Sequence, residues 1–175
     1  MIHHQQLPLG FEHRPALSDE DFLVAPCNRQ AVDWIDLWPR WPAPALVVNG
    51  PAGCGKTHLA RAFMEKSGAV ALTLEDLDSG EPPDLLGAHR ACVVEDVDSL
   101  LKLEEQLLHL YNTVKETNRH MLLTASKPLA RLNIALPDLR SRLVAAPSAD
   151  IGSPDDALIA AVLVKLFADR QLKVD

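Results

Sequence analysis

Short runs of small and β-branched apolar residues alternate along the chain with longer segments in which apolar residues recur every three or four positions. The runs lie at residues 45–49, 69–74, 91–94 and 121–126. Runs of this length between polar or glycine-containing segments predict buried strands, whereas the wider spacing predicts helices. Strands that alternate with helices are typical of a parallel sheet covered on both faces. The pattern therefore predicts an α/β fold of the αβα sandwich type.

The helical spacing predicts several helices. They are expected at residues 28–38, from residue 57 onward, at 100–117 and at 153–169. Asn28 is expected to cap the first of these helices. Ser153 is expected to cap the last, with Pro154 in its first turn. The polar segment that contains Pro82 and Pro83 is expected to be a loop.

A phosphate-binding pattern follows the first predicted strand. The segment Gly50-Pro51-Ala52-Gly53-Cys54-Gly55-Lys56-Thr57 fits G-x-x-x-x-G-K-[ST]. Glycines let successive backbone N–H groups point at a phosphate, and the following helix adds the positive end of its dipole. Lys56 can then reach the β- and γ-phosphates, and Thr57 can ligate Mg²⁺. The residues expected to contact ADP or ATP are Pro51, Ala52, Gly53, Cys54, Gly55, Lys56, Thr57 and His58.

Acidic and polar residues at the ends of later strands form a second candidate site. Glu95 and Asp96 follow the run at 91–94, in the form of a Walker B motif. Glu95 is expected to hold Mg²⁺ and Asp96 to orient an attacking water, because ligands bind at the carboxyl ends of parallel strands. At the end of the next run, Thr124 or Ser126 either faces the γ-phosphate or simply ends the strand.

Two arginines, Arg140 and Arg142, precede a short apolar strand that is expected near Leu143 and Val144. Exposed arginines are usually solvated surface charges. Beside a P-loop, such a residue can instead be an arginine finger, a cation that reaches the γ-phosphate on a neighbouring subunit. Both interpretations stay open on the residues alone.

The first 17 residues are polar, contain proline and lack a period, which predicts a flexible tail. Within this tail a small cluster combines a glutamine with apolar side chains: Gln6, Leu7, Pro8, Leu9 and Phe11. Such a cluster is either a docking peptide or a strap that packs on its own domain.

Composition narrows the class of protein. The chain has 175 residues, which suits one domain, and a net charge of −7 with 17 scattered Lys and Arg. Strong direct binding to nucleic acid is therefore not expected, because it needs clustered cations, although a small contact stays open. An odd number of cysteines, with no signal peptide or long apolar span, predicts a reduced cytoplasmic protein that has no membrane partner. Cys54 stands at a variable position of the P-loop and is not expected to be a reactive thiol, whereas a role of Cys27, Cys54 and Cys92 beyond packing stays open.

The motifs in this order resemble the AAA+ ATPases, and within them the DnaA replication-initiator family. Segments 108–112, 122–124, 127–128 and 132–143 carry the resemblance beyond the P-loop and the Walker B motif, and it extends from Gln6 to the end of the chain. It is nearest to the Hda type, which regulates the initiator. The resemblance implies a tail at 1–17, a core at 18–152 with five parallel strands in AAA+ order, and a truncated helical lid at 153–175.

The resemblance also implies roles for individual residues. The peptide Gln6-Leu7-Pro8-Leu9 is similar to the one by which this family docks on the DNA polymerase III sliding clamp. Arg142 matches the arginine finger, which acts in trans on ATP bound to DnaA. Ser126 occupies the sensor position, where the family usually has Asp or Asn.

The implied function is a nucleotide-binding regulator that docks on the clamp and stimulates hydrolysis of DnaA-bound ATP, which prevents re-initiation. The free protein would be a monomer or a homodimer. One alternative is a self-sufficient ATPase or helicase loader that works as a homo-oligomer. A structural clamp-binding adaptor is the other.

Overall fold

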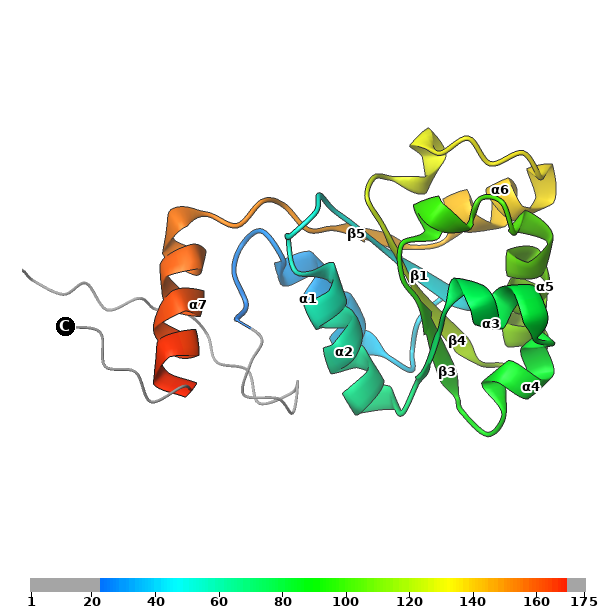
Figure 1. Cartoon of the computed structure of the whole chain (residues 1–175), viewed down its shortest axis with the longest axis horizontal. Helices are drawn as coiled ribbons and strands as arrows, with labels where there is room; N and C mark the ends of the chain where they lie inside the picture. The colour runs from blue at the N-terminus through cyan, green and yellow to red at the C-terminus, as the bar shows by residue number, and fades with distance from the viewer. Residues whose placement is uncertain (1–22, 170–175) are drawn as a thin grey trace, which may run out of the picture.

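The computed structural model describes residues 23–169, which form one sheet with helices on both faces (Figure 1). The strands are β1 (Ala45–Asn49), β2 (Val70–Leu72), β3 (Ala91–Val94), β4 (His120–Ala125) and β5 (Ser148–Asp150). Neighbouring strands pair in parallel, in the order β2-β3-β4-β1-β5. The predicted α/β fold with five parallel strands is confirmed.

Two layers of helices cover the sheet, and each packs on its own set of strand side chains. The helices are α1 (Arg29–Leu37), α2 (Lys56–Ser67), α3 (Leu74–Ser79), α4 (Pro82–Leu86), α5 (Glu104–Glu116), α6 (Pro137–Ala145) and α7 (Asp156–Asp169). In β1, Ala45 and Val47 pack with α3 to α6, whereas Leu46 and Val48 pack with α1 and α2. This alternation is the pleat of a strand buried on both faces. As a result, α2 and α6 lie on opposite faces of the sheet.

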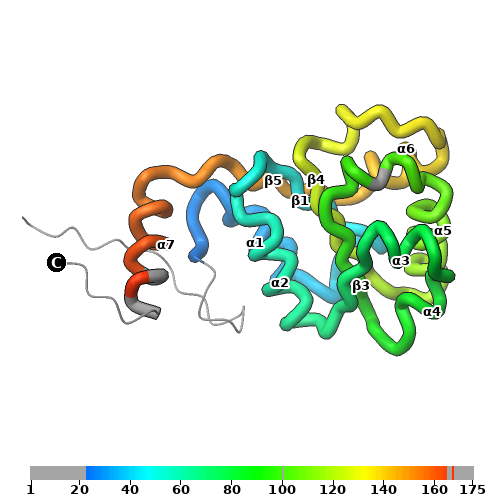
Figure 2. The backbone as a smooth tube through the Cα atoms, in the orientation of Figure 1, coloured from blue at the N-terminus to red at the C-terminus, as the bar shows by residue number. Residues whose placement is uncertain are grey.

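The last helix, α7, follows β5 and stands apart from the helices that cover the sheet (Figure 2). Its side chains Ile159, Val162, Leu163, Val164 and Phe167 are 38–65% exposed. From Leu23 to the end of α7, no helix is both long enough and apolar enough to span a membrane.

The region between β2 and β3 differs from the prediction of a long strand followed by a loop. β2 ends at Leu72 because Thr73 caps α3: its hydroxyl accepts the N–H of Asp76, whose carboxylate accepts the N–H of Thr73. The expected loop instead contains α3 and α4. The second of these begins at Pro82, because proline fits the first helical turn, where its missing N–H is not needed.

Helix boundaries differ elsewhere as well. α5 begins at Glu104 instead of residue 100, because Val97–Leu100 form a 3₁₀ turn. α7 begins at Asp156, and Asp155 Oδ1, not Ser153, accepts the N–H of Leu158 at 2.8 Å. Asn28 precedes α1 as expected, but its Oδ1 accepts the N–H of Ala25 and makes no cap to the helix.

The strand expected near Leu143 and Val144 is wrong, because both residues lie in α6. Pro137 stands at the start of this helix, and Leu139 and Leu143 form its buried stripe one turn apart. The following strand, β5, comes five residues later, at Ser148–Asp150, and it contains only one buried residue, Ala149.

A buried carboxylate ties α5 to the start of α6. Glu104 is only 8% exposed; its Oε1 accepts the N–H of Ala135 at 2.8 Å and its Oε2 accepts the N–H of Leu136 at 2.6 Å. Backbone N–H groups at a helix start have no partner within the helix. Glu104 therefore satisfies two donors and fixes the entry of the chain into α6.

We expect Glu104→Ala to lower the free energy of unfolding by about 2–4 kcal/mol, because two N–H groups lose a charged acceptor. Urea denaturation would measure the change. Glu105→Ala, at the exposed neighbouring position on α5, is the matched control and should stay within about 0.5 kcal/mol of the parent. Equal effects of the two substitutions would contradict the role of Glu104 as a clamp.

Candidate functional site

The P-loop connects β1 to α2, as the sequence predicts. Gly55 has φ +105° and Gly53 has φ +76°, a left-handed conformation that L side chains rarely adopt. A Cβ at either position would meet no atom within 4 Å, so this side of the loop is open. Gly50 is different: a Cβ there would lie 2.6 Å from Cys54 Sγ and 2.6 Å from the Ile151 carbonyl oxygen.

Lys56 is folded across the mouth of the loop. Its Nζ donates to the carbonyl oxygens of Gly50 at 2.8 Å and Pro51 at 2.9 Å. The ammonium group is thus held beside the backbone that would surround a phosphate. These are neutral carbonyl acceptors, and a charged phosphate oxygen would be a stronger partner for the same donors.

The structure brings Thr57 and Glu95 together from α2 and the end of β3. The Thr57 hydroxyl donates to Glu95 Oε2 at 2.6 Å. A hydroxyl and a carboxylate at one point are the oxygen donors that Mg²⁺ prefers, and Mg²⁺ usually keeps water for its remaining positions. The pair therefore fits the expected metal, and Glu95 reaches Thr57 although the first Walker B acid is more often Asp.

Asp96 is exposed and has φ 52°, a conformation that is uncommon outside glycine. Its N–H donates to the hydroxyl of Thr124, which is buried in β4, at 3.0 Å. The hydroxyl of Thr124 thus acts on the backbone of the Walker B segment. Asp96 stands beside Glu95 at the carboxyl edge of the sheet, where the sequence placed it.

Ser126 follows β4 and is held by a residue that the sequence did not single out. Asp98 Oδ2 accepts the N–H of Ser126 at 2.6 Å, and Asp98 Oδ1 accepts its hydroxyl at 2.9 Å. The serine hydroxyl is therefore directed to Asp98. The sequence signal was present, since Asp98 follows the Walker B acids closely, but its role depends on a contact between the 3₁₀ turn Val97–Leu100 and the residue that follows β4.

A cavity of about 340 Å³ adjoins the P-loop. One wall consists of Gly53, Cys54, Gly55 and His58, and the opposite wall consists of Pro154 and α7 residues Leu158, Ile159, Val162 and Leu163. Leu23 and Asn28 complete it. Apolar walls beside a phosphate-binding loop suit the base and sugar of a nucleotide. The P-loop wall follows from the sequence motif, whereas no motif marks α7, Leu23 or Asn28 as residues that line this cavity.

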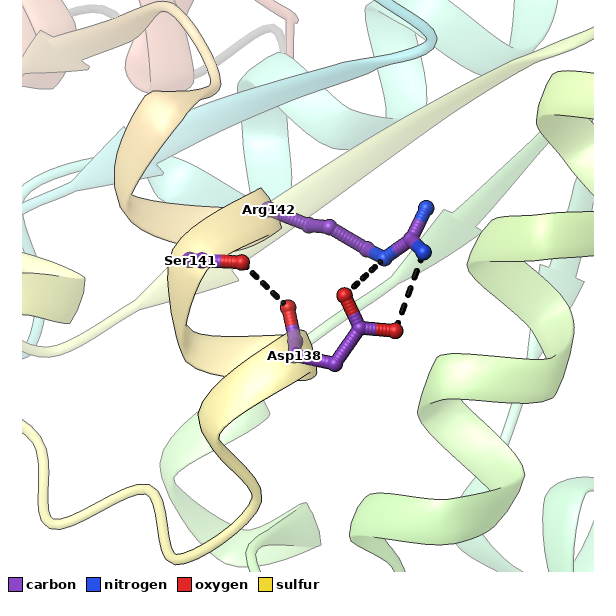
Figure 3. A network of polar contacts seen from close by, with 3 residues as sticks. All are labelled: Asp138, Ser141 and Arg142. Carbon is purple, nitrogen blue, oxygen red and sulfur yellow. Dashed lines mark hydrogen bonds and ion pairs between the residues drawn. The ribbon is translucent and has the colours of Figure 1, made fainter.

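Arg142 lies on α6, where Asp138 holds its guanidinium (Figure 3), and the ring of Tyr111 lies close to the same group. Nε and Nη2 donate to Asp138 Oδ1 and Oδ2 at 2.8 and 2.9 Å, and Cζ stands 5.6 Å from the centre of the Tyr111 ring. The hydrogen bond from Arg142 holds the pKa of Asp138 below its usual value, and the same bond raises the pKa of Arg142. The two hydrogen bonds hold the positively charged guanidinium in place, and the Arg142 side chain is 27% exposed.

The two arginines of the pair separate, because residues two apart point to different sides of a helix. Arg140 borders a surface hollow of about 450 Å³ together with Ile134, Ser141 and Val144. Arg142 instead faces Tyr111 on α5. The contacts of Arg142, the candidate arginine finger, therefore differ from those of Arg140.

The tail residues and the cysteines complete the comparison with the sequence predictions. Gln6, Leu7, Pro8, Leu9 and Phe11 lie outside the described residues. Cys27, Cys54 and Cys92 are free thiols, and burial raises the pKa of Cys92 to about 12. That cysteine packs in the core, with Val94 and Met121.

No family model matches the chain. Curated relatives include the chromosomal replication initiator protein DnaA of Treponema denticola, 24% identical over 92% of this chain and 39% of that protein. DnaA of Borreliella afzelii is 24% identical over 89% of this chain and 37% of that protein. The chain thus spans about two fifths of the length of these relatives.

Solved structures share the fold. A DNA replication initiation factor superposes with a TM-score of 0.77 and 15% identity over 95% of this chain and 58% of its own. Domain III of Thermotoga maritima DnaA superposes with a TM-score of 0.74 and 17% sequence identity, and the match covers 93% of this chain and 78% of that one. AMPPCP-bound DnaA from Aquifex aeolicus superposes with a TM-score of 0.70 and 18% sequence identity, and the match covers 88% of this chain and 55% of that one. With the P-loop and the strand order, these matches show that the chain has the P-loop α/β fold of these structures and is similar in sequence to part of DnaA.

Proposed function

We propose that the chain binds ADP or ATP with Mg²⁺ at the P-loop. Lys56 would contact the phosphates, Thr57 and Glu95 would hold the metal, and the cavity lined by α7 would take the base and sugar. Bound Mg²⁺ would neutralise phosphate charge. The related Aquifex aeolicus DnaA is bound to AMPPCP, which supports this assignment. On this proposal residues 153–175 belong to a lid over the nucleotide.

We further propose that the protein regulates replication initiation in the Hda manner, by presenting Arg142 to ATP bound on DnaA. The observation that carries this proposal is the placement of a fixed, partly exposed guanidinium on α6, on the face of the sheet opposite α2. An arginine finger can be supplied in trans by a neighbouring molecule, and Arg142 on that face would have this role. DnaA would pass to its ADP form, and a second initiation would be suppressed.

The tail completes this proposal. Gln6, Leu7, Pro8, Leu9 and Phe11 would dock the protein on the sliding clamp, which concentrates it where replication has begun. The protein would act in the cytoplasm, as a monomer or homodimer. Its own ATP turnover would be slow or absent, because its role is to activate hydrolysis on another chain.

Lys56→Ala should weaken ATP binding by about tenfold to a hundredfold, since hydrogen bonds from an ammonium to phosphate are lost. Isothermal titration calorimetry of the full chain would measure this. Arg61→Ala removes an exposed cation from the same helix and is the matched control. A parental affinity in Lys56→Ala would remove the P-loop from the proposed site.

Glu95→Gln should reduce the gain in ATP affinity that Mg²⁺ provides by roughly tenfold, while affinity in EDTA stays close to parental, because only the metal loses a carboxylate. Titration of ATP with and without Mg²⁺ separates the two effects. Asp98→Asn, an acid bound to Ser126, serves as the comparison and should keep most of the Mg²⁺ gain. An equal loss in both variants would contradict the assignment of Glu95.

Stimulation of ATP hydrolysis by the cognate DnaA tests the regulator role. On clamp loaded on DNA, Arg142→Ala should lower the stimulated rate by roughly a thousandfold, because the cation at the γ-phosphate is lost. A triple Gln6→Ala, Leu7→Ala, Leu9→Ala variant should lose the stimulation that depends on the clamp, because it can no longer dock there and meet DnaA. No stimulation by the parent, with ATP turnover of its own that Arg142→Ala abolishes, would favour the self-sufficient ATPase instead.

A further inference from the structure

Asp138 and Arg142 lie one turn apart on α6 and are joined by two parallel hydrogen bonds. Nε donates to Oδ1 at 2.8 Å and Nη2 donates to Oδ2 at 2.9 Å. A bidentate pair of this kind fixes the plane of the guanidinium as well as its position. Figure 3 shows the carboxylate along the side of the guanidinium, with the other terminal nitrogen pointing away from it.

The carboxylate uses only one edge of the guanidinium. Arginine has five N–H donors, and Asp138 takes one from Nε and one from Nη2. The two donors of Nη1 and the second donor of Nη2 remain, and they form a fork at the end of the side chain. That fork matches two phosphate oxygens. Asp138 therefore orients Arg142 without occupying the donors that an anion needs.

Tyr111 restricts the guanidinium from a second direction. Its ring belongs to the core between α5 and the sheet, is only 6% exposed, and lies 5.6 Å from Cζ of Arg142. A cation at this distance from an aromatic ring is attracted to it. Because α5 also clamps the start of α6 through Glu104, both the helix and the side chain that it carries are fixed by the same neighbour.

We propose that Asp138 is a positioning residue for Arg142: it holds the guanidinium so that its end fork points outward to a phosphate on another subunit. The proposal rests on the proposed function of Arg142 as an arginine finger. A long arginine side chain loses conformational entropy when it is immobilised. Asp138 and Tyr111 restrict it before the partner arrives, so less freedom is lost when the γ-phosphate binds.

A purely stabilising role for Asp138 predicts different results. The side chain is 56% exposed, and an exposed i,i+4 ion pair contributes little to stability. As an acid in the first turn of α6 it also favours the helix, but any carboxylate there would do so. The effect on stimulation should therefore greatly exceed the effect on folding.

The test is stimulated ATP hydrolysis by the cognate DnaA on DNA-loaded clamp, with DnaA varied to separate kcat from the half-saturating concentration. Asp138→Asn should lower kcat about tenfold and leave half-saturation unchanged, because the finger is misplaced but the contact surface is kept. Asp138→Glu should keep most of the rate. Ser141→Ala is the matched control, since its hydroxyl bonds the backbone carbonyl of Asp138 at 2.8 Å and not the guanidinium.

The double variant Asp138→Asn, Arg142→Ala decides whether Asp138 acts through Arg142. If the double variant and Arg142→Ala give the same stimulated hydrolysis rate, Asp138 acts through Arg142. A lower rate in the double variant would overturn the proposal, since Asp138 would then act by itself. If Asp138→Asn stimulates fully and Arg142→Ala does not stimulate, the positioning role of Asp138 is wrong, whereas the finger role of Arg142 stands. Full activity of Arg142→Ala overturns both.

A measurement without the partner completes the test. In the free protein, the Nε–H signal of Arg142 in nitrogen-15 NMR should be protected from exchange, and Asp138→Asn should remove that protection whereas Ser141→Ala should not. Unchanged protection in Asp138→Asn would overturn the proposal whatever the hydrolysis rates.

Discussion

The arrangement of the P-loop at the carboxyl edge of the sheet depends on how closely the parallel strands β4, β1 and β5 approach one another where they end. The N–H of Gly50 donates to the carbonyl of Ala125 at 3.1 Å, and the N–H of Ile151 donates to the carbonyl of Asn49 at 2.7 Å. Between these bonds the chain leaves β1 with no room for a Cβ at Gly50. This close contact sets where the P-loop begins, and it brings the ends of β4 and β5 to the same edge.

Local patterns were sufficient for the elements at that edge. Four-residue and five-residue apolar runs can be buried on both faces only in a covered parallel sheet, so β1, β3 and β4 and their carboxyl ends followed from the sequence. The P-loop and the acids Glu95 and Asp96 were found for the same reason, because each stands next to such a strand. Pro82 predicted a loop, but in the structure it begins helix α4.

Contacts between distant segments were beyond the sequence patterns. Ser126 bonds Asp98, 28 residues earlier, and Ala135 bonds Glu104, 31 residues earlier. The residues next to Asp98 and Glu104 in the sequence do not indicate which distant residue each of them contacts. Asp138 and Arg142 are local to one helix, but a strand was expected where that helix continues. The contact between Tyr111 on α5 and Arg142 on α6 depends on how the two helices pack.

The two helix layers have a consequence for how this protein can change over time. Strand residues that pack on α2 are different from those that pack on α5 and α6, since they alternate along each strand. A sequence can therefore drift in one layer while the other keeps its packing. The P-loop helix α2 and the proposed arginine finger on α6 belong to different layers, so substitutions that repack one layer are expected to leave the packing of the other unchanged.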